Sequence, residues 1–324
     1  MGRKKLHFGK GNSLTETIFL CQHQRVLPAT IGPIRADSCD TFSRHSAALS
    51  TFLLIAALTL FVSIQEAVCE ESFAEPADRS FTSQVDDSIQ RYVELQPLKW
   101  DSKGSVDVLI ALHGHGSDRW QYIRENRGEC RGVREVAAEN GMLFISPDYR
   151  GTTSWMGPTA EADLSQLIGI LRTHYNVRHL YLAGGSMGGT SALIFAARHP
   201  DEISGVLAEN ATANMMEYNG FQDAIAASYG GTKKEIPQEY RSRSAELHVE
   251  TLTMPIALTV GGKDRVVPPD SVRRLATHLQ KHNADRILLL DDPSGGHATN
   301  LEDTIRAMRF LVEKVNQIQS QPDR

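Results

Sequence analysis

Residues 179–189 read His-Leu-Tyr-Leu-Ala-Gly-Gly-Ser-Met-Gly-Gly and contain the pattern Gly-x-Ser-x-Gly, centred on Ser186. A short apolar stretch that suits a buried strand precedes the pattern, and a helical run ended by Pro200 follows it. Strand, tight turn and helix form the setting in which this pattern exposes a nucleophilic serine. A dinucleotide-binding loop would need glycine at Ser186, and a phosphate-binding loop would need Gly-Lys-Ser/Thr, so the pattern predicts a catalytic serine.

Candidate partners for Ser186 follow in the chain order serine, acid, histidine that this kind of site uses. Asp264 lies in a Gly-rich turn after the apolar run 254–260, and His297 follows the apolar run 286–290 and a second Gly-rich turn. Acids and histidines placed after successive strands should meet the serine at one edge of the sheet. We expect Ser186 to be the nucleophile, His297 the general base and Asp264 the group that orients the imidazole.

Each partner also has a purely structural interpretation. Asp264 could serve only as a turn residue, because aspartate favours turns through local hydrogen bonds, and His297 could be an ordinary loop histidine. Asp291 and Asp292 are rival acids, but they lie close to His297 in sequence, whereas the acid of such a site normally follows an earlier strand. Three residues in the expected order favour the catalytic interpretation.

A His-Gly turn early in the chain completes the expected site. The apolar run 106–112 reads as a strand, and His113-Gly-His-Gly116 follows it. In this arrangement the turn and the residue after the nucleophile each supply a backbone N–H to the oxyanion. We therefore predict the two oxyanion donors at His115 and Met187.

The chain from about residue 90 to 317 resembles an α/β-hydrolase, and within that superfamily the esterase and prolyl-oligopeptidase-like branch. The resemblance implies serine hydrolase chemistry that needs no metal or organic cofactor. A stretch of the peptidase branch, Tyr-x-x-x-Ser-Pro-like, is similar to residues 240–248, which contain no proline, and the sequence shows no N-terminal propeller. The segments that carry the resemblance are 112–116, 148–151, 184–189, 262–264 and 295–297.

Alternating strand and helix patterns predict an α/β-hydrolase fold with a mostly parallel central sheet and helices on both faces. Residues 211–250 form the main insertion and are expected to make a small cap, with Met215, Met216, Tyr218 and Phe221 either facing the site or packing on the core. Strands are expected near 90–96, 106–112, 142–147, 179–183, 204–209, 254–260 and 286–290, and helices near 131–140, 160–174, 187–199, 222–229, 269–282 and 300–317.

The N-terminal part has a different composition from the rest. Residues 1–46 form a basic leader with seven Lys/Arg and three Asp/Glu, and an uncharged apolar run covers 47–64. The segment 47–69 is predicted to be a cleaved secretory signal or, alternatively, a membrane anchor, so we expect a secreted or periplasmic enzyme or one held to the membrane by this segment alone. Residues 70–88 read as a polar linker, and the catalytic domain is expected over 89–318.

The amino-acid composition limits the classes of molecule that the protein is expected to bind. Without residues 1–74 the chain has 27 Lys/Arg and 33 Asp/Glu, which argues against nucleic-acid binding. Of four cysteines only Cys130 falls within the expected domain, so no disulfide framework is indicated. The expected partner is a small ester, preferably short-chain or aryl, or alternatively a short peptide; the sequence carries no signal for an oligomeric state.

Two other functions have a sequence feature each. His113-x-His115 with Asp118 could open a metallohydrolase site, although the further histidines of such sites are missing, so we expect no metal. A non-catalytic binding protein of this fold would usually have lost the serine or the histidine. His113, Arg150 and Trp155 are candidate substrate-binding residues, with a structural Arg150–Asp163 pair and a packed Trp155 as the alternative.

Overall fold

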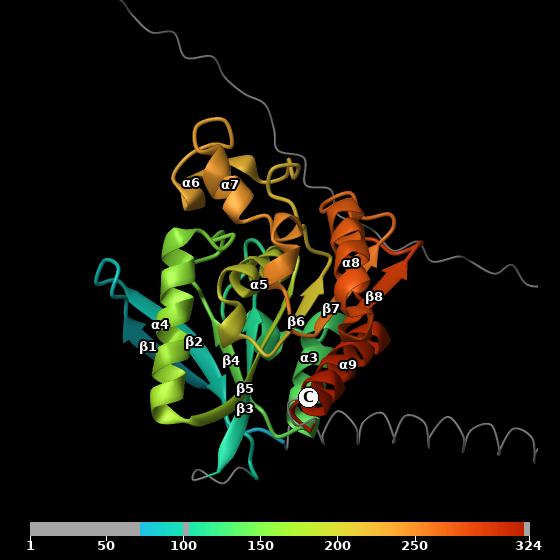
Figure 1. The fold of residues 1–324 in the computed structure, drawn as a ribbon. Coiled ribbons are helices and arrows are strands. Elements are labelled where there is room, and N and C mark those ends of the chain that lie inside the picture. Colours follow the sequence, from blue (N-terminus) through green and yellow to red (C-terminus); the bar gives the residue numbers. More distant parts are fainter. Residues whose placement is uncertain (1–71, 100–103, 321–324) are drawn as a thin grey trace, which may run out of the picture. The chain divides into compact units, whose positions relative to one another are not determined.

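The computed structural model describes residues 72–99 and 104–320. Their central feature is an eight-stranded sheet, which runs across Figure 1 with the strands in the order β1-β2-β4-β3-β5-β6-β7-β8. β1 and β2 are antiparallel to their neighbours and the other strands are parallel. The strands are β1 (Ala77–Thr82), β2 (Ile89–Leu95), β3 (Ser105–Leu112), β4 (Leu143–Pro147), β5 (Asn176–Gly185), β6 (Gly205–Glu209), β7 (Ile256–Gly261) and β8 (Ile287–Asp292).

Helices cover both faces of this sheet. One face packs against α3 (Gly128–Glu139) and α9 (Leu301–Gln319), and the other against α4 (Pro158–His174), α5 (Met187–Arg198) and α8 (Asp270–Asn283). The mostly parallel α/β-hydrolase arrangement predicted from the sequence is therefore confirmed. The short helices are α2 (Gln121–Arg124), α6 (Gln222–Tyr229) and α7 (Pro237–Ser242), with 3₁₀ turns η1 (Pro200–Glu202), η2 (Ala245–Leu247), η3 (Val249–Thr251) and η4 (Ala284–Arg286).

The inner strands form because their sequences are apolar on both sides. All residues of β4, β6 and β7 are buried, as expected for parallel strands between two helical layers. The outer helices are amphipathic instead: α9 buries one stripe, which includes Ala307, Met308 and Leu311, and leaves its polar residues outside. This difference explains why both kinds of element are readable from the sequence.

β1 lies inside the segment 70–88 that the sequence predicts to be a linker, so that interpretation is wrong for residues 77–82. β1 pairs with β2 from Ala77 opposite Glu94 to Thr82 opposite Ile89. The strand has only polar or partly buried side chains, because it sits at the edge of the sheet and has no apolar pattern to reveal it. The turn between β1 and β2 is anchored to α4, because Ser83 Oγ donates a 2.5 Å hydrogen bond to Asp163 of that helix.

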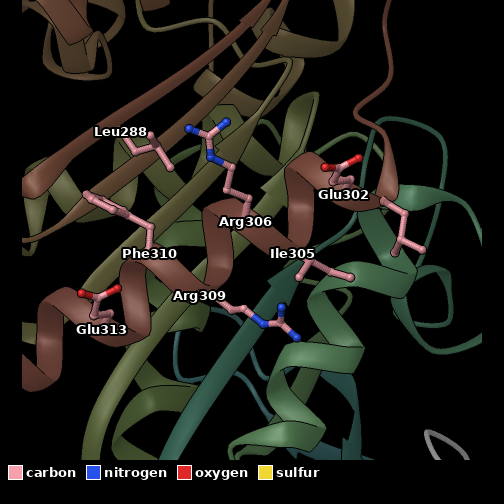
Figure 2. A pocket seen from close by; sticks show the side chains of 8 residues that line it. Leu288, Glu302, Ile305, Arg306, Arg309, Phe310 and Glu313 are labelled. Carbon is pink, nitrogen blue, oxygen red and sulfur yellow. The ribbon is translucent and has the colours of Figure 1, made fainter. Parts of the chain in front are cut away.

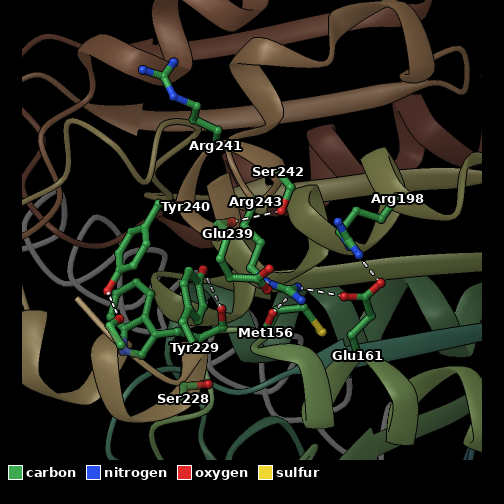
Figure 3. A network of polar contacts seen from close by, with 12 residues as sticks. Met156, Glu161, Arg198, Ser228, Tyr229, Glu239, Tyr240, Arg241, Ser242 and Arg243 are labelled. Atoms are coloured by element: carbon green, nitrogen blue, oxygen red, sulfur yellow. Dashed lines mark hydrogen bonds and ion pairs between the residues drawn. The ribbon is translucent and has the colours of Figure 1, made fainter. Parts of the chain in front are cut away.

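The insertion between β6 and β7 carries α6 and α7, which lie beyond one end of the sheet in Figure 1. A buried arginine fastens it: Arg243 donates to the Met156 carbonyl oxygen at 2.6 Å and pairs with Glu161 at 2.8 Å (Figure 3). Although burial favours the neutral form of Glu161, hydrogen bonds from His199 and Arg198 and the charge of Arg243 lower its pKa to about 2. A charged, paired network thus fixes the insertion to α4.

A groove with a volume of about 830 Å³ lies between β8 and α9, at the edge of the sheet. Leu288, Ile305 and Phe310 form its apolar floor, with Arg306, Arg309 and two glutamates at its margin (Figure 2). None of the predicted catalytic residues lines it. The groove is therefore separate from the residues predicted to form the active site.

The predicted signal or anchor segment 47–69 lies outside the described residues. Within 72–99 and 104–320, no helix combines the length and the apolar character needed to cross a membrane.

Candidate active site

Ser186 occupies a sharp turn between β5 and α5. Its backbone has φ 57° and ψ −119°, a conformation that residues with a side chain rarely adopt, and its N–H donates a 2.8 Å hydrogen bond to the Glu209 carbonyl oxygen. The flanking glycines permit this turn. A Cβ atom on Gly184 would lie 2.4 Å from the Gly188 backbone, and one on Gly188 would lie 1.9 Å from the Leu112 carbonyl oxygen. The motif thus lifts the Ser186 hydroxyl out of the sheet.

The structure brings the three predicted triad residues together. His297 Nε2 lies 2.9 Å from Ser186 Oγ, and His297 Nδ1 lies 2.7 Å from Asp264 Oδ2. Asp264 is 6% exposed, and its other oxygen accepts hydrogen bonds from the backbone N–H groups of Val266 and Val267. A carboxylate held by three donors favours the tautomer with the proton on Nδ1. The lone pair of Nε2 then faces the Ser186 hydroxyl, which is the geometry of a general base.

The rival acids lie elsewhere. Asp291 forms a two-bond pair with Arg273 of α8 at 2.7 and 2.8 Å. Asp292 accepts hydrogen bonds from the backbone and hydroxyl of Ser294. Both carboxylates are thus occupied by local partners, while Asp264 alone among the three acids contacts His297.

The two predicted oxyanion donors have free N–H groups. Met187 is the first residue of α5, whose first N–H groups have no acceptor within the helix. His115 follows β3, and its neighbours Gly114 and Gly116 donate to Gln121 and Thr152, respectively. Among the hydrogen bonds of the described residues, neither the His115 nor the Met187 N–H donates to a protein acceptor. Both can therefore serve a ligand.

Aromatic side chains from two other segments, at residue 155 and at residues 218–221, gather near His115. Trp155 Nε1 donates a 3.0 Å hydrogen bond to His115 Nδ1, and the ring of Phe221 lies 4.2 Å from the His115 ring. Trp155 also packs against Tyr218, whose hydroxyl donates to the Val266 carbonyl oxygen beside Asp264. Burial lowers the pKa of His115 and so favours its neutral form. The resulting aromatic wall consists of His115, Trp155, Tyr218 and Phe221.

Two of the three candidate substrate-binding residues have structural roles instead. The Arg150 guanidinium pairs with Asp86 at 3.0 Å and with Asp163 at 3.2 Å, which joins the β1–β2 hairpin to α4. The ring of His113 is completely buried between the carbonyl oxygens of Gly114 and Asp148. Both residues point to partners within the protein, so the prediction that they line a substrate pocket is wrong.

Trp155 lies at the site but does not reach solvent. Its indole is completely buried and donates a hydrogen bond to His115, so Trp155 holds the His115 ring in place without contacting solvent itself. The exposed member of the wall is Phe221, which is 38% exposed. Of the two, Phe221 is therefore the one that a substrate can touch.

The metallohydrolase alternative would need His113 and His115 to converge. The two rings take separate contacts, His113 with backbone carbonyls and His115 with Trp155. Within the described ranges, no three His, Cys, Asp or Glu side chains come together as a metal-binding group.

The loop that carries His297 is anchored by polar residues that the sequence does not single out. Thr299 donates its backbone N–H to Glu129 of α3 at 3.1 Å. Its hydroxyl lies 2.6 Å from the Thr259 hydroxyl and accepts a 2.8 Å hydrogen bond from Asn210. None of these residues stands out in its local sequence, so only the fold reveals that they all anchor the loop of His297.

Comparison with known proteins agrees with this geometry. The prolyl oligopeptidase family matches residues 130–317, which is more than half of the chain. The uncharacterized peptidase YtmA of Bacillus subtilis is 26% identical over 141 residues, which cover 40% of this chain and 55% of YtmA. The matched part thus spans about half the length of that curated relative.

Solved structures share the fold at low sequence identity. An esterase from Pyrococcus furiosus has a TM-score of 0.55 at 19% identity, with 76% of this chain and 95% of the esterase covered. An S-formylglutathione hydrolase from Agrobacterium tumefaciens has a TM-score of 0.57 at 15% identity, with 75% and 98% covered. A putative dipeptidyl aminopeptidase IV from Bacteroides ovatus has a TM-score of 0.60 at 13% identity, with 76% and only 36% covered. On the extent of the family match, this chain belongs to the prolyl oligopeptidase family.

Proposed function

We propose that this protein is a serine hydrolase that cleaves carboxylic esters through an acyl-enzyme on Ser186. The observation that carries the proposal is the continuous hydrogen-bonded chain from Ser186 through His297 to Asp264, with distances of 2.9 and 2.7 Å. The strained backbone of Ser186 and two unused N–H groups beside it complete the requirements for acyl transfer.

The first half-reaction transfers the acyl group. Ser186 Oγ attacks the ester carbonyl carbon while its proton moves to His297 Nε2, and Asp264 stabilises the imidazolium. The N–H groups of Met187 and His115 hold the developing oxyanion, each contributing about 3 kcal/mol of transition-state stabilisation. When the C–O bond to the leaving group breaks, His297 gives the proton to the departing alcohol oxygen. Ser186 then carries the acyl group.

The second half-reaction uses water as the nucleophile. His297 Nε2 accepts a proton from water as the water oxygen attacks the acyl-enzyme carbonyl. When the intermediate collapses, the bond to Ser186 Oγ breaks and His297 returns the proton to that oxygen. The products are a carboxylic acid and the free enzyme, and no redox or metal step is required for this sequence.

The small insertion supports a preference for short-chain or aryl esters. Its two helices, α6 and α7, are eight and six residues long, so they offer little apolar surface to a long lipid chain. The exposed ring of Phe221 supplies an apolar wall next to His115, against which a flat acyl group can pack. The likeness to an esterase from Pyrococcus furiosus, which covers 76% of this chain, also supports an ester substrate.

The function can be tested with a substrate panel and two variants. We expect wild-type protein to hydrolyse p-nitrophenyl acetate and benzoate faster than prolyl or alanyl p-nitroanilides at equal concentration. Ser186→Ala should lose ester hydrolysis and covalent labelling by a fluorophosphonate. Ser320→Ala, which changes an exposed serine at the end of α9, is the matched control and should keep both. Faster cleavage of the anilides would instead assign a peptidase, and labelling of Ser186→Ala would place the nucleophile elsewhere.

We also propose that the protein acts outside the cytoplasm or at the membrane. The basic leader and the uncharged run 47–64 support this proposal. Mass spectrometry of the native protein should find a mature N-terminus between about residues 66 and 76 if the segment is a cleaved signal. A membrane-bound protein with the leader intact would indicate an anchor, and an intact protein in the cytoplasmic fraction would contradict both.

A further inference from the structure

Glu209 is the last residue of β6, and its backbone contacts the nucleophile Ser186. Its carbonyl oxygen accepts the backbone N–H of Ser186 at 2.8 Å, so the two residues share one hydrogen bond across neighbouring strands. Its side chain has no exposed surface and points to the face of the sheet that α3 and α9 cover. A carboxyl group in that position has no water to stabilise a negative charge.

The contacts of this carboxyl group are those of a neutral acid. Glu209 Oε1 lies 2.7 Å from the Thr304 hydroxyl, and no partner is present for Oε2 among the described residues. The Thr304 hydroxyl also lies 3.0 Å from the Asn300 carbonyl oxygen. A hydroxyl has a single proton, and Asn300 can only accept. Both contacts are hydrogen bonds at once only if Thr304 donates to Asn300 and accepts the proton of Glu209.

The surrounding charges point the same way. Glu129 of α3, whose charge acts on Glu209, is paired with Arg127 at 3.3 Å, while burial raises the pKa of Glu129 above its ordinary value. Burial and the charge of Glu129 raise the pKa of Glu209 to about 8, against opposing effects of Thr304 and Arg127. Burial also raises the pKa of Tyr122 and brings the pKa of Cys130 to about 11, so both stay neutral. Arg127, the cation that acts on Glu209, is itself paired with Glu125 and Glu129.

Thr304 connects this acid to the catalytic histidine. The hydroxyl lies 3.0 Å from the backbone carbonyl oxygen of Asn300, and the side-chain Oδ1 of Asn300 caps α9 by accepting the Asp303 N–H at 2.9 Å. Asn300 follows Thr299, the residue that anchors the loop of His297 through Glu129 and Asn210. The Glu209 side chain therefore supports the histidine segment while its backbone supports Ser186.

We propose that Glu209 is a positioning residue, held as a neutral carboxylic acid, whose O–H bond to Thr304 joins the Ser186 turn to the segment that carries His297. When Glu209 loses its proton, the bond to Thr304 must reverse, so the Asn300 carbonyl keeps the Thr304 backbone N–H but loses the Thr304 hydroxyl as a donor, and a buried charge appears beside Glu129. Ionisation of Glu209 therefore weakens the link between the Ser186 turn and the segment that carries His297. The inference rests on the proposed serine hydrolase function only for its activity measurement.

The first test compares the alkaline side of the pH–kcat profile. Wild-type kcat should fall about tenfold per pH unit above the titration of Glu209. Glu209→Gln keeps an N–H donor for Thr304 but cannot ionise, so its kcat should stay level over the same range. Glu302→Gln, which removes a carboxylate outside the cluster from the same end of α9, should keep the wild-type fall. An alkaline fall of equal size in Glu209→Gln, or none in the wild type, would overturn the proposal.

The second test reads the proton directly and needs no enzymatic activity. Infrared difference spectroscopy of the wild type should show the carbonyl stretch of a buried carboxylic acid at neutral pH, lost on titration to alkaline pH and absent from Glu209→Gln. A wild type without that band at neutral pH contradicts the inference even if Glu209→Gln fails to fold. If ester hydrolysis survives in Ser186→Ala, the proposed function fails, while the infrared band still decides the state of Glu209.

Discussion

The guanidinium of Arg243 donates a 2.6 Å hydrogen bond to the carbonyl oxygen of Met156, 87 positions earlier in the chain. The side chain of Arg243 is 1% exposed, and it also pairs with Glu239 of α7, the helix that ends directly before it. Met156 follows Trp155, so this single contact connects the cap insertion to the aromatic wall of the site. The aromatic wall and the cap are therefore linked through one buried side chain.

Replacing that arginine should destabilise the fold. Arg243→Leu leaves the Met156 carbonyl and part of Glu161 without their donor in a buried setting, which should cost about 3–5 kcal/mol of unfolding free energy. Urea denaturation followed by circular dichroism measures the loss. Arg241→Leu changes an exposed neighbour on the same helix and should stay close to wild type. Equal midpoints for the two variants would show that the buried network contributes no stability.

The acid of the triad should be needed for its charge. Asp264→Asn keeps the shape of the side chain, but its amide favours the wrong imidazole tautomer and does not stabilise the imidazolium. We expect kcat to fall by about 10⁴-fold with little change in KM. Asp292→Asn, which alters the rival acid near His297, should keep nearly full kcat. The opposite result, a large loss only in Asp292→Asn, would reassign the acid.

Gly188, two residues after the nucleophile, should tolerate no side chain. A Cβ atom on Gly188 would lie 1.9 Å from the Leu112 carbonyl oxygen, so Gly188→Ala must push α5 away from β3. We expect little folded protein and no activity. Gly169→Ala, on α4 where no other atom lies within 4 Å of the new methyl group, is the matched control. It should raise the unfolding free energy by about 0.5–1 kcal/mol, which thermal denaturation can detect. A folded, active Gly188→Ala would contradict the tight turn.

Glu209 should also make stability depend on pH. Its pKa rises on folding from 4.5 to about 8, so the folded state binds a proton that the unfolded state releases. The stability from this group is complete below pH 4.5 and is lost as pH rises to about 8, by about 1.4 kcal/mol per pH unit between those values. The wild type should therefore lose stability relative to Glu209→Gln over this range. Parallel stability curves for the two proteins would argue against a shifted pKa.

Phe221 should govern the choice of acyl group. The residue has φ 49°, a left-handed backbone that a phenylalanine adopts only with strain, and this conformation holds its ring against His115. Phe221→Ala should raise KM for p-nitrophenyl benzoate about two- to tenfold, because a lost aromatic contact costs about 0.5–1.5 kcal/mol, and affect the acetate much less. Phe221→Tyr keeps the ring and serves as the control. An equal rise for both esters would remove Phe221 from the acyl pocket.

The strands, the main helices and the meeting of Ser186, Asp264 and His297 were predictable because each depends on a local pattern. An apolar run followed by a Gly-rich turn identifies the end of a parallel strand wherever it occurs, and the chain order of the three residues supplies their relation. β1 escaped prediction because an edge strand with polar side chains has no such pattern. Its existence depends on pairing with β2.

The support of the site was not predictable for a related reason. Glu209 follows an apolar run, where an acid usually marks the exposed end of a strand, and nothing nearby shows that α3 and α9 bury it. Arg150 could be read as a pocket residue because its partners Asp86 and Asp163 lie in different elements. Single polar residues acquire their roles from neighbours that are distant in sequence, and a single sequence does not encode those neighbours locally.

The anchoring of the histidine loop has a consequence for the order in which the protein folds and becomes active. His297 lies 111 positions after Ser186, and Thr299 bonds to Glu129 across 170 positions. The Ser186 turn can form before the later part of the chain has folded, but its serine has no base until the loop that carries His297 packs against α3. Hydrolytic activity therefore requires that the histidine loop has docked, and a partly folded chain that has formed only the Ser186 turn lacks it.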